Sequence, residues 1–122
     1  MEKKIGGMWG WLLQRITGVL LALGMTVHYL YLHFFTGGNL SFEVVSMRLK
    51  SPAWIFFDTF LLAVILYHGF YGLLGIIYDY NPKKNIKITL NYTFLFLGII
   101  LFFCGFYALM IFHNPSTPPA IF

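Results

Sequence analysis

Three long apolar segments dominate the chain, and most charged residues lie outside them. The segments cover about residues 9–35, 53–78 and 88–112. Each is longer than the ~20 residues that an α-helix needs to cross about 30 Å of hydrocarbon at 1.5 Å per residue. The pattern therefore predicts an all-α integral membrane protein with three transmembrane helices, which form a single membrane domain over residues 1–122.

The ends of the segments carry the signals of membrane helices. A Gly-Gly pair follows the first segment and Pro52 opens the second, and these residue types stop and start helices. Tryptophan and tyrosine residues gather near the ends, where an aromatic belt forms at the membrane interface. The first segment resembles a signal peptide in its early residues, but it continues to Phe35 and contains Arg15, so we expect a membrane span.

Composition indicates that lipid or other subunits surround the helices. Hydrophobic residues make up 59% of the chain and charged residues only 10%, whereas a soluble domain carries about 25% charged residues. A chain of 122 residues cannot hide this much apolar surface in a core of its own. We therefore expect a lipid bilayer and a partner chain around it. The net charge is +4, but the basic residues form no nucleic-acid-reading motif, so we expect no nucleic acid partner.

The distribution of lysine and arginine predicts the orientation in the membrane. Arg48 and Lys50 would lie on one side, and the remaining basic residues would share the other side: Lys3, Lys4, Arg15, Lys83, Lys84 and Lys87. The side richer in Lys and Arg faces the cytoplasm. We therefore expect a multi-pass protein of the cell inner (cytoplasmic) membrane, with its N-terminus in the cytoplasm and its C-terminus outside.

Two of the four histidines lie where water cannot easily reach them. His28 falls inside the first span and His68 near the middle of the second, whereas His33 and His113 fall at outer span ends that headgroups and water can hydrate. An ionisable residue inside a span indicates a functional site, and a neutral imidazole is a common metal ligand. A packing role for each buried histidine remains the alternative.

The depths of these two histidines exclude a shared iron. The first span runs outward and the second inward, so His28 and His68 differ in depth by roughly 12 Å at 1.5 Å per residue. The axial nitrogens of one haem iron are only about 4 Å apart, twice the ~2 Å of a metal–imidazole bond. If both histidines are haem ligands, they serve two haems at two depths, and each iron takes its second ligand from a partner.

Glycines share the faces of both histidines. At 100° per residue, Gly72 and Gly75 lie within about 40° of His68, and Gly24 shares the face of His28. Small residues at these positions would let a flat porphyrin approach the backbone, or they would let another helix pack closely. Spacing alone leaves both interpretations open.

An Asp-Tyr pair ends the second span. Asp79 follows His68 by eleven residues, which returns it to within about 20° of the same face, about three turns nearer the cytoplasm. A phenol beside a carboxylate can hydrogen-bond and deliver protons to a quinone carbonyl. The alternative is that Tyr80 is an interfacial anchor and that Asp79 ends the helix before Asn81 and Pro82.

These motifs together resemble the cytochrome b membrane-anchor subunits of succinate dehydrogenase (complex II) and fumarate reductase. The resemblance rests on QRITGVLL in the first span, YHGFYGLLGIIYDY in the second, a lysine-bearing loop and a plain third span. It implies that His68 binds haem b and that Tyr80, with Asp79, faces quinone. It also places Arg15 and Thr17 near quinone or a haem propionate, and we expect Arg15 at a depth similar to that of Tyr80.

The stretch VHYLYLHFF, followed by LYHGFYG, resembles the di-haem branch of this family, in which each of the first two spans supplies one ligand. This resemblance implies that His28 binds a second haem b and that both haems are shared with a second membrane-anchor subunit. The chain would pass electrons from an iron–sulfur subunit to quinone, its substrate, while a flavoprotein subunit oxidises succinate; the chain itself would not catalyse succinate chemistry. The alternatives are a di-haem b anchor of hydrogenase or formate dehydrogenase type and a haem-free small membrane protein.

Overall fold

The computed structural model describes residues 6–114, and within this range the chain is helical and contains no strand. The elements are α1 (Gly7–Leu30), which continues as a π-helical turn η1 (Tyr31–Phe35), α2 (Phe42–Leu49), α3 (Pro52–Asp79) and α4 (Lys84–His113). Three helical stretches are long and apolar enough to cross a membrane: Gly7–Phe35, Pro52–Asp79 and Lys84–His113. The predicted three-span, all-α fold is confirmed, and the spans begin and end within a few residues of the predicted bounds.

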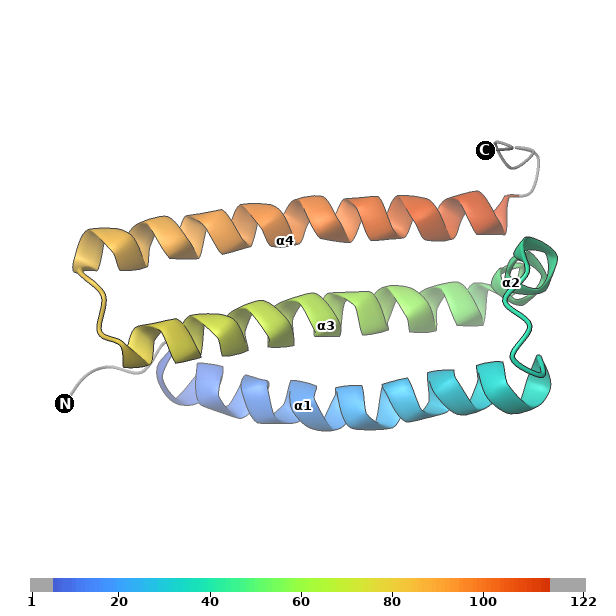
Figure 1. The fold of residues 1–122 in the computed structure, drawn as a ribbon, viewed down its shortest axis with the longest axis horizontal. Helices are drawn as coiled ribbons and strands as arrows, with labels where there is room; N and C mark the ends of the chain where they lie inside the picture. The colour runs from blue at the N-terminus through green and yellow to red at the C-terminus, as the bar shows by residue number, and fades with distance from the viewer. Residues whose placement is uncertain (1–5, 115–122) are drawn as a thin grey trace.

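The three long helices lie side by side in a row with α3 at its centre (Figure 1). Helix α3 packs against α1 on one side and α4 on the other, and within residues 6–114 no Cα atom of α1 lies within 8 Å of one of α4. The start of α1 lies near the turn between α3 and α4, at what we call the turn end; α2 lies across the opposite end, the α2 end. A row of this kind leaves broad faces of α1 and α4 to lipid or to other subunits.

The turn between α3 and α4 is closed by polar contacts. Asn81 has a φ of 47°, a left-handed conformation that commonly ends helices, and Pro82 follows it. The Tyr78 hydroxyl lies 2.9 Å from Oδ1 of Asn91 and 3.2 Å from the carbonyl oxygen of Lys87. The Lys87 ammonium donates to Oδ1 of Asn81 at 3.1 Å. These bonds fix the start of α4 beside the end of α3.

The α2 end contains a short helix that the hydropathy pattern does not predict. Ser41 caps α2, because its hydroxyl accepts a hydrogen bond from the backbone N–H of Val44 at 3.5 Å. Leu49, the last residue of α2, is only 1% exposed. The carbonyl oxygen of Leu49 lies 2.7 Å from Nδ1 of His113, so it accepts a hydrogen bond from that ring. This contact ties α2 to the last residue of α4.

Glycines set how closely the long helices approach. A Cβ atom at Gly24 would lie 2.7 Å from Cδ1 of Leu61, and one at Gly72 would lie 2.8 Å from Nε2 of Gln14. Both glycines therefore serve the packing of α1 on α3. No heavy atom of the described chain lies within 4 Å of the corresponding position at Gly75. The sequence left two roles open for these glycines, close approach of a porphyrin and close packing of helices. Gly24 and Gly72 have the second role.

We predict that Gly24→Ile separates α1 from α3 and lowers the thermal stability of the chain in detergent. Inserting a branched side chain into a closely packed interface typically costs about 1–3 kcal/mol, and Leu61 is 5% exposed and cannot swing into solvent. Ala22→Ile is the matched control, because Ala22 is on an exposed face of the same helix. Equal unfolding midpoints for the two variants would contradict close packing at Gly24.

Candidate histidine sites

Helices α1 and α3 pack antiparallel in one continuous register. Gly18 lies against the ring of His68, Gly24 against Leu61, and His28 against Asp58. His28 is therefore level with Asp58, which precedes His68 by ten residues on α3. Ten residues of helix span about 15 Å, so the two histidines belong to separate sites and cannot bind one iron.

The first site is centred on His68 and built by α1. Thr17 is buried, and its hydroxyl oxygen lies 2.7 Å from the carbonyl oxygen of Leu13 and 3.0 Å from Nδ1 of His68. A carbonyl oxygen can only accept, so a hydroxyl that donates its proton to Leu13 is free to accept from the His68 ring. In this arrangement Nδ1 of His68 carries the proton, and Nε2 keeps a lone pair that can bind a metal.

Two further groups of α1 hold the His68 segment in place. The side-chain amide of Gln14 donates to the backbone carbonyl oxygen of His68 at 3.1 Å. A Cβ atom at Gly18 would lie 3.2 Å from Cε1 of His68, so the ring lies close against the backbone of α1. The ring is thus held by Thr17 on one edge and by the α1 backbone beside it.

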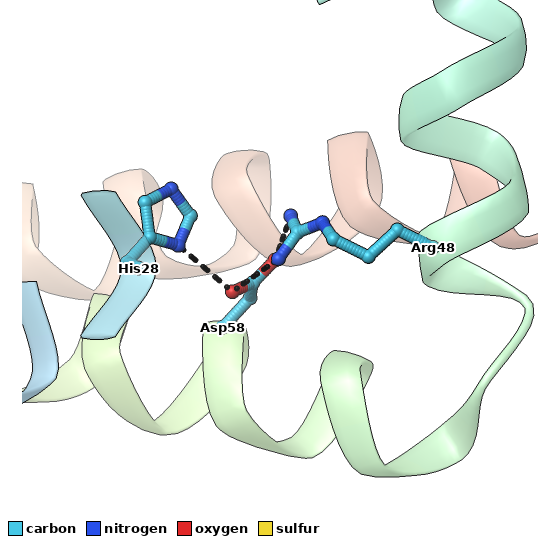
Figure 2. Close-up of polar contacts among 3 residues, drawn as sticks. All are labelled: His28, Arg48 and Asp58. Atoms are coloured by element: carbon cyan, nitrogen blue, oxygen red, sulfur yellow. Dashed lines mark hydrogen bonds and ion pairs between the residues drawn. The ribbon is translucent and has the colours of Figure 1, made fainter. Parts of the chain in front are cut away.

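The second site joins three helices at the α2 end. His28 on α1 and Arg48 on α2 converge on Asp58 of α3 (Figure 2). The Arg48 guanidinium donates to both carboxylate oxygens, at 2.5 and 3.3 Å, and the two side chains are only 7% and 8% exposed. Two hydrogen bonds from one guanidinium to one carboxylate make a geometrically specific, charge-balanced pair.

Asp58 is also the acceptor nearest to His28. Nδ1 of His28 lies 3.4 Å from Oδ1 of Asp58, a long contact that lacks ideal hydrogen-bond geometry. That nitrogen is buried and has no hydrogen-bond partner within residues 6–114. The other ring nitrogen lies on the side of the ring away from Asp58 (Figure 2). A carboxylate only accepts, so the arrangement favours a proton on Nδ1 and a lone pair on Nε2.

Three of the buried polar atoms without partners belong to residues of these two sites. Within the described chain they are Gln14 Oε1, His28 Nδ1, Ser46 Oγ, Arg48 Nε and Thr59 Oγ1. The first belongs to the residue that braces His68, and the other four lie on His28, Arg48 or chain neighbours of Arg48 and Asp58. Buried polar groups are nearly always hydrogen-bonded in native structures. The unpartnered atoms of Gln14, His28 and Arg48 belong to residues of the two sites, where a further polar group could satisfy them.

A groove adjoins the second site. It has a volume of about 360 Å³, and residues of all four helices line it, among them His28, Arg48, Asp58, Leu61 and Phe112. Apart from His28, Arg48 and Asp58, the lining is apolar. A mainly apolar groove with a few polar groups at one end suits an amphipathic ligand, and haem, with its apolar ring and charged propionates, is such a ligand.

Of the four residues expected to contact quinone, only Tyr80 and Asp79 lie together. Tyr80 and Asp79 are exposed at the turn end, and Tyr80 is 86% exposed. The α1/α3 register places Arg15 level with about residue 71, some nine residues or about 14 Å from Tyr80. The expectation of similar depths is therefore wrong. The Arg15 guanidinium instead stacks on Trp11, 3.8 Å from the ring centroid. The Thr17 hydroxyl is already bonded within the His68 site.

The remaining histidines lie at the α2 end, as their sequence positions predict. His33 is exposed and stacks on Tyr29, with ring centroids 5.7 Å apart, and His113 binds Leu49 as described above. Within residues 6–114 no group of three or more His, Cys, Asp or Glu is gathered to hold a bare metal ion. Iron in haem, which receives four ligands from the porphyrin, needs only one or two from protein.

Sequence reasoning missed three residues that build these sites, Gln14, Arg48 and Asp58. Asp58 could have been found, because it is the one acidic residue in the interior of a predicted span, and such a residue requires a partner. Gln14 and Arg48 carry no comparable signal, since their partners depend on which helix faces meet.

Comparison with known proteins identifies the family. A sequence profile described as "Succinate dehydrogenase/Fumarate reductase transmembrane subunit" matches residues 3–106. The succinate dehydrogenase hydrophobic membrane anchor subunit of Archaeoglobus fulgidus is 31% identical over 99 residues, which cover 81% of this chain and 85% of the relative. The subunit of the same name from Rickettsia felis is 30% identical over 104 residues, covering 85% of this chain and 80% of the relative.

The corresponding subunit of Rickettsia prowazekii is 33% identical over 95 residues, which cover 75% of this chain and 74% of the relative. No solved structure matches the chain significantly. The profile covers most of the chain, and the three apolar helices agree with a multi-pass membrane protein. The chain therefore belongs to the succinate dehydrogenase/fumarate reductase transmembrane subunit family.

Proposed function

We propose that this chain is the haem b-binding membrane anchor of a succinate:quinone oxidoreductase and that it passes electrons from an iron–sulfur subunit to quinone. One observation carries the proposal: both half-buried histidines have Nδ1 beside an oxygen atom that can accept its proton, 3.0 Å away at Thr17 and 3.4 Å away at Asp58, and this arrangement leaves Nε2 for a metal. Metal-binding histidines typically hydrogen-bond in this way through their other nitrogen. A histidine that only packs between helices does not require it.

His68 and His28 would each bind one haem b, and the bound haems would supply reversible one-electron chemistry. Thr17 and Gly18 would orient the His68 ring, and Asp58 would orient that of His28. In place of the expected quinone contact, we assign Thr17 to the support of His68. The broad free faces of α1 and α4 support docking of a second anchor subunit, which would supply the other axial ligands.

We assign quinone binding to the turn end, with Tyr80 donating a hydrogen bond to a quinone carbonyl. Asp79 is the last residue of α3, where the negative end of the helix dipole disfavours a carboxylate. A functional role for Asp79, either orienting Tyr80 or relaying a proton to quinone, would explain why a carboxylate occupies this unfavourable position. Lys83, Lys84 and Lys87 lie at the same end, so the positive-inside rule puts it in the cytoplasm, where the iron–sulfur and flavoprotein subunits would dock.

The orientation predicts which residues a membrane-impermeant thiol reagent can reach. In a Cys104→Ser background, Glu43→Cys on α2 should react in intact cells because the α2 end faces outside. Lys84→Cys at the turn end should react only after the membrane is permeabilised. Glu43 and Lys84 are both exposed, so access to the reagent is the difference between them. The reverse labelling pattern would invert the orientation and the assignment of the quinone site.

His68→Ala should remove one equivalent of haem per purified complex, because one iron loses a strong axial ligand. A milder variant, Thr17→Val, keeps the shape of the side chain but no longer accepts from Nδ1 of His68. We expect it to shift the midpoint potential of one haem or weaken its binding. The matched control is Thr26→Val. The Thr26 hydroxyl also donates to a backbone carbonyl oxygen, that of Ala22, but this bond is exposed and involves no histidine.

The measurements are the haem-to-protein ratio and a spectroscopic redox titration. Unchanged haem content in His68→Ala would remove the assignment of this ligand. Equal potentials and haem occupancy in Thr17→Val and Thr26→Val would show that Thr17 does not act through His68.

Tyr80→Phe should slow quinone reduction while haem content and dye-linked succinate oxidation remain unchanged. The substitution removes only a hydroxyl, and a neutral hydrogen bond is worth about 0.5–1.5 kcal/mol, which corresponds to roughly a 2- to 12-fold change in rate. Tyr107→Phe is the control. Tyr107 is also well exposed, at 68%, but it lies in the half of α4 nearer the α2 end, far from the turn end. Quinone kinetics equal to those of the control would return Tyr80 to the role of interfacial anchor.

A further inference from the structure

The pair formed by Arg48 and Asp58 does more than attach α2 to α3. Both side chains are more than nine-tenths buried, and the guanidinium donates to both oxygens of the carboxylate. Burying an ion pair removes both charges from water, and apolar residues of similar volume would often pack at least as stably. Anchoring α2 therefore does not by itself explain a buried ion pair at this place.

The position of the pair relative to His28 gives it a second role. Oδ1 of Asp58 receives the weaker of the two Arg48 bonds, at 3.3 Å, and the same atom lies 3.4 Å from Nδ1 of His28. The oxygen bonded more closely to Arg48 is Oδ2. One carboxylate oxygen is thus held mainly by arginine, while the other keeps capacity to accept from the imidazole (Figure 2).

We propose that Arg48 and Asp58 act together as positioning residues for His28 and set the reduction potential of the haem that it binds. This inference rests on the proposed function, in which His28 is an axial ligand. Asp58 would hold the ring with Nδ1 protonated and Nε2 toward the iron. Arg48 would hold Asp58 in place and balance its charge, so that the haem experiences a dipole instead of a buried negative charge.

The two members of the pair should then affect the potential with opposite signs. Oxidation of haem iron adds one positive charge, which a nearby negative charge favours and a nearby positive charge opposes. Arg48→Gln leaves the Asp58 carboxylate unbalanced, so the midpoint potential should fall. Asp58→Asn leaves the Arg48 guanidinium unbalanced, so the potential should rise. In a low-dielectric setting, such charges act more strongly than they do in water.

The test is a spectroscopic redox titration of the purified complex carrying each variant. We expect the two single variants to shift one haem component in opposite directions, each by at least a tenfold change in the ratio of oxidised to reduced haem at fixed potential, or 59 mV for one electron. The double variant Arg48→Gln/Asp58→Asn should return close to the wild-type potential. The other component, assigned to His68, should stay constant in every variant and report that the complex has assembled.

Lys50→Gln is the matched control, because it removes a positive charge from the same end of the chain at an exposed position. It should leave both potentials unchanged. Single variants that shift the potential in the same direction, or not at all, would overturn the inference and leave the pair a structural clamp. If Arg48→Gln does not assemble, the rise in Asp58→Asn and its reversal in the double variant still decide the question.

Failure of the underlying function gives a different result. His28→Ala should erase the component that the Arg48 and Asp58 variants shift. If the wild-type complex contains no component that His28→Ala removes, the assignment of His28 as a ligand fails. If that component exists but does not respond to Arg48 and Asp58, only the present inference fails.

Discussion

Inside the hydrocarbon of a bilayer, a polar side chain must find its partner within the protein, and this constraint organises the whole chain. Helix α3 carries His68, which is half-buried, and Asp58, which is buried, in its interior. Each is paired by a neighbouring helix, His68 by Thr17 of α1 and Asp58 by Arg48 of α2. Glycines let α1 approach α3 closely enough for the pair of Thr17 and His68 to form. Helix α3, at the centre of the row, thus has polar partners on both α1 and α2.

Under the proposed function, the same pairs would prepare the two histidines as haem ligands. A histidine that binds a metal usually has its other ring nitrogen beside a polar group that orients the ring. At His68 the group beside Nδ1 is a neutral hydroxyl, 3.0 Å away, whereas at His28 it is a carboxylate, 3.4 Å away, that is balanced by a guanidinium. The electrostatics of the two sites would therefore differ, and so would the potentials of the two haems.

Much of this organisation could be predicted from the sequence. Hydropathy predicts the three spans, and the rise per residue predicts that His28 and His68 lie at different depths. Each of these predictions needs only the position of a residue along its own helix. The cross-helix partners could not be predicted in this way, since Thr17 meets His68 only in one register of α1 against α3. The depth predicted for Arg15 is wrong for the same reason. It was estimated from the ends of the first span, whereas the actual depth relative to Tyr80 depends on the register of α1 against α3. Helix α2 was missed because eight residues leave too little apolar periodicity to detect.

The central claim is that two haems at two depths are bound through His68 and His28, and one measurement tests it directly. A reduced-minus-oxidised spectrum of the purified wild-type complex, followed through a potentiometric titration, counts the b-type components and their potentials. We expect haem b absorption that titrates as two one-electron components with separate midpoints, at two equivalents of haem per complex. A complex that contains the flavoprotein and iron–sulfur subunits but shows no haem absorption, or a single component at one equivalent, would contradict the claim.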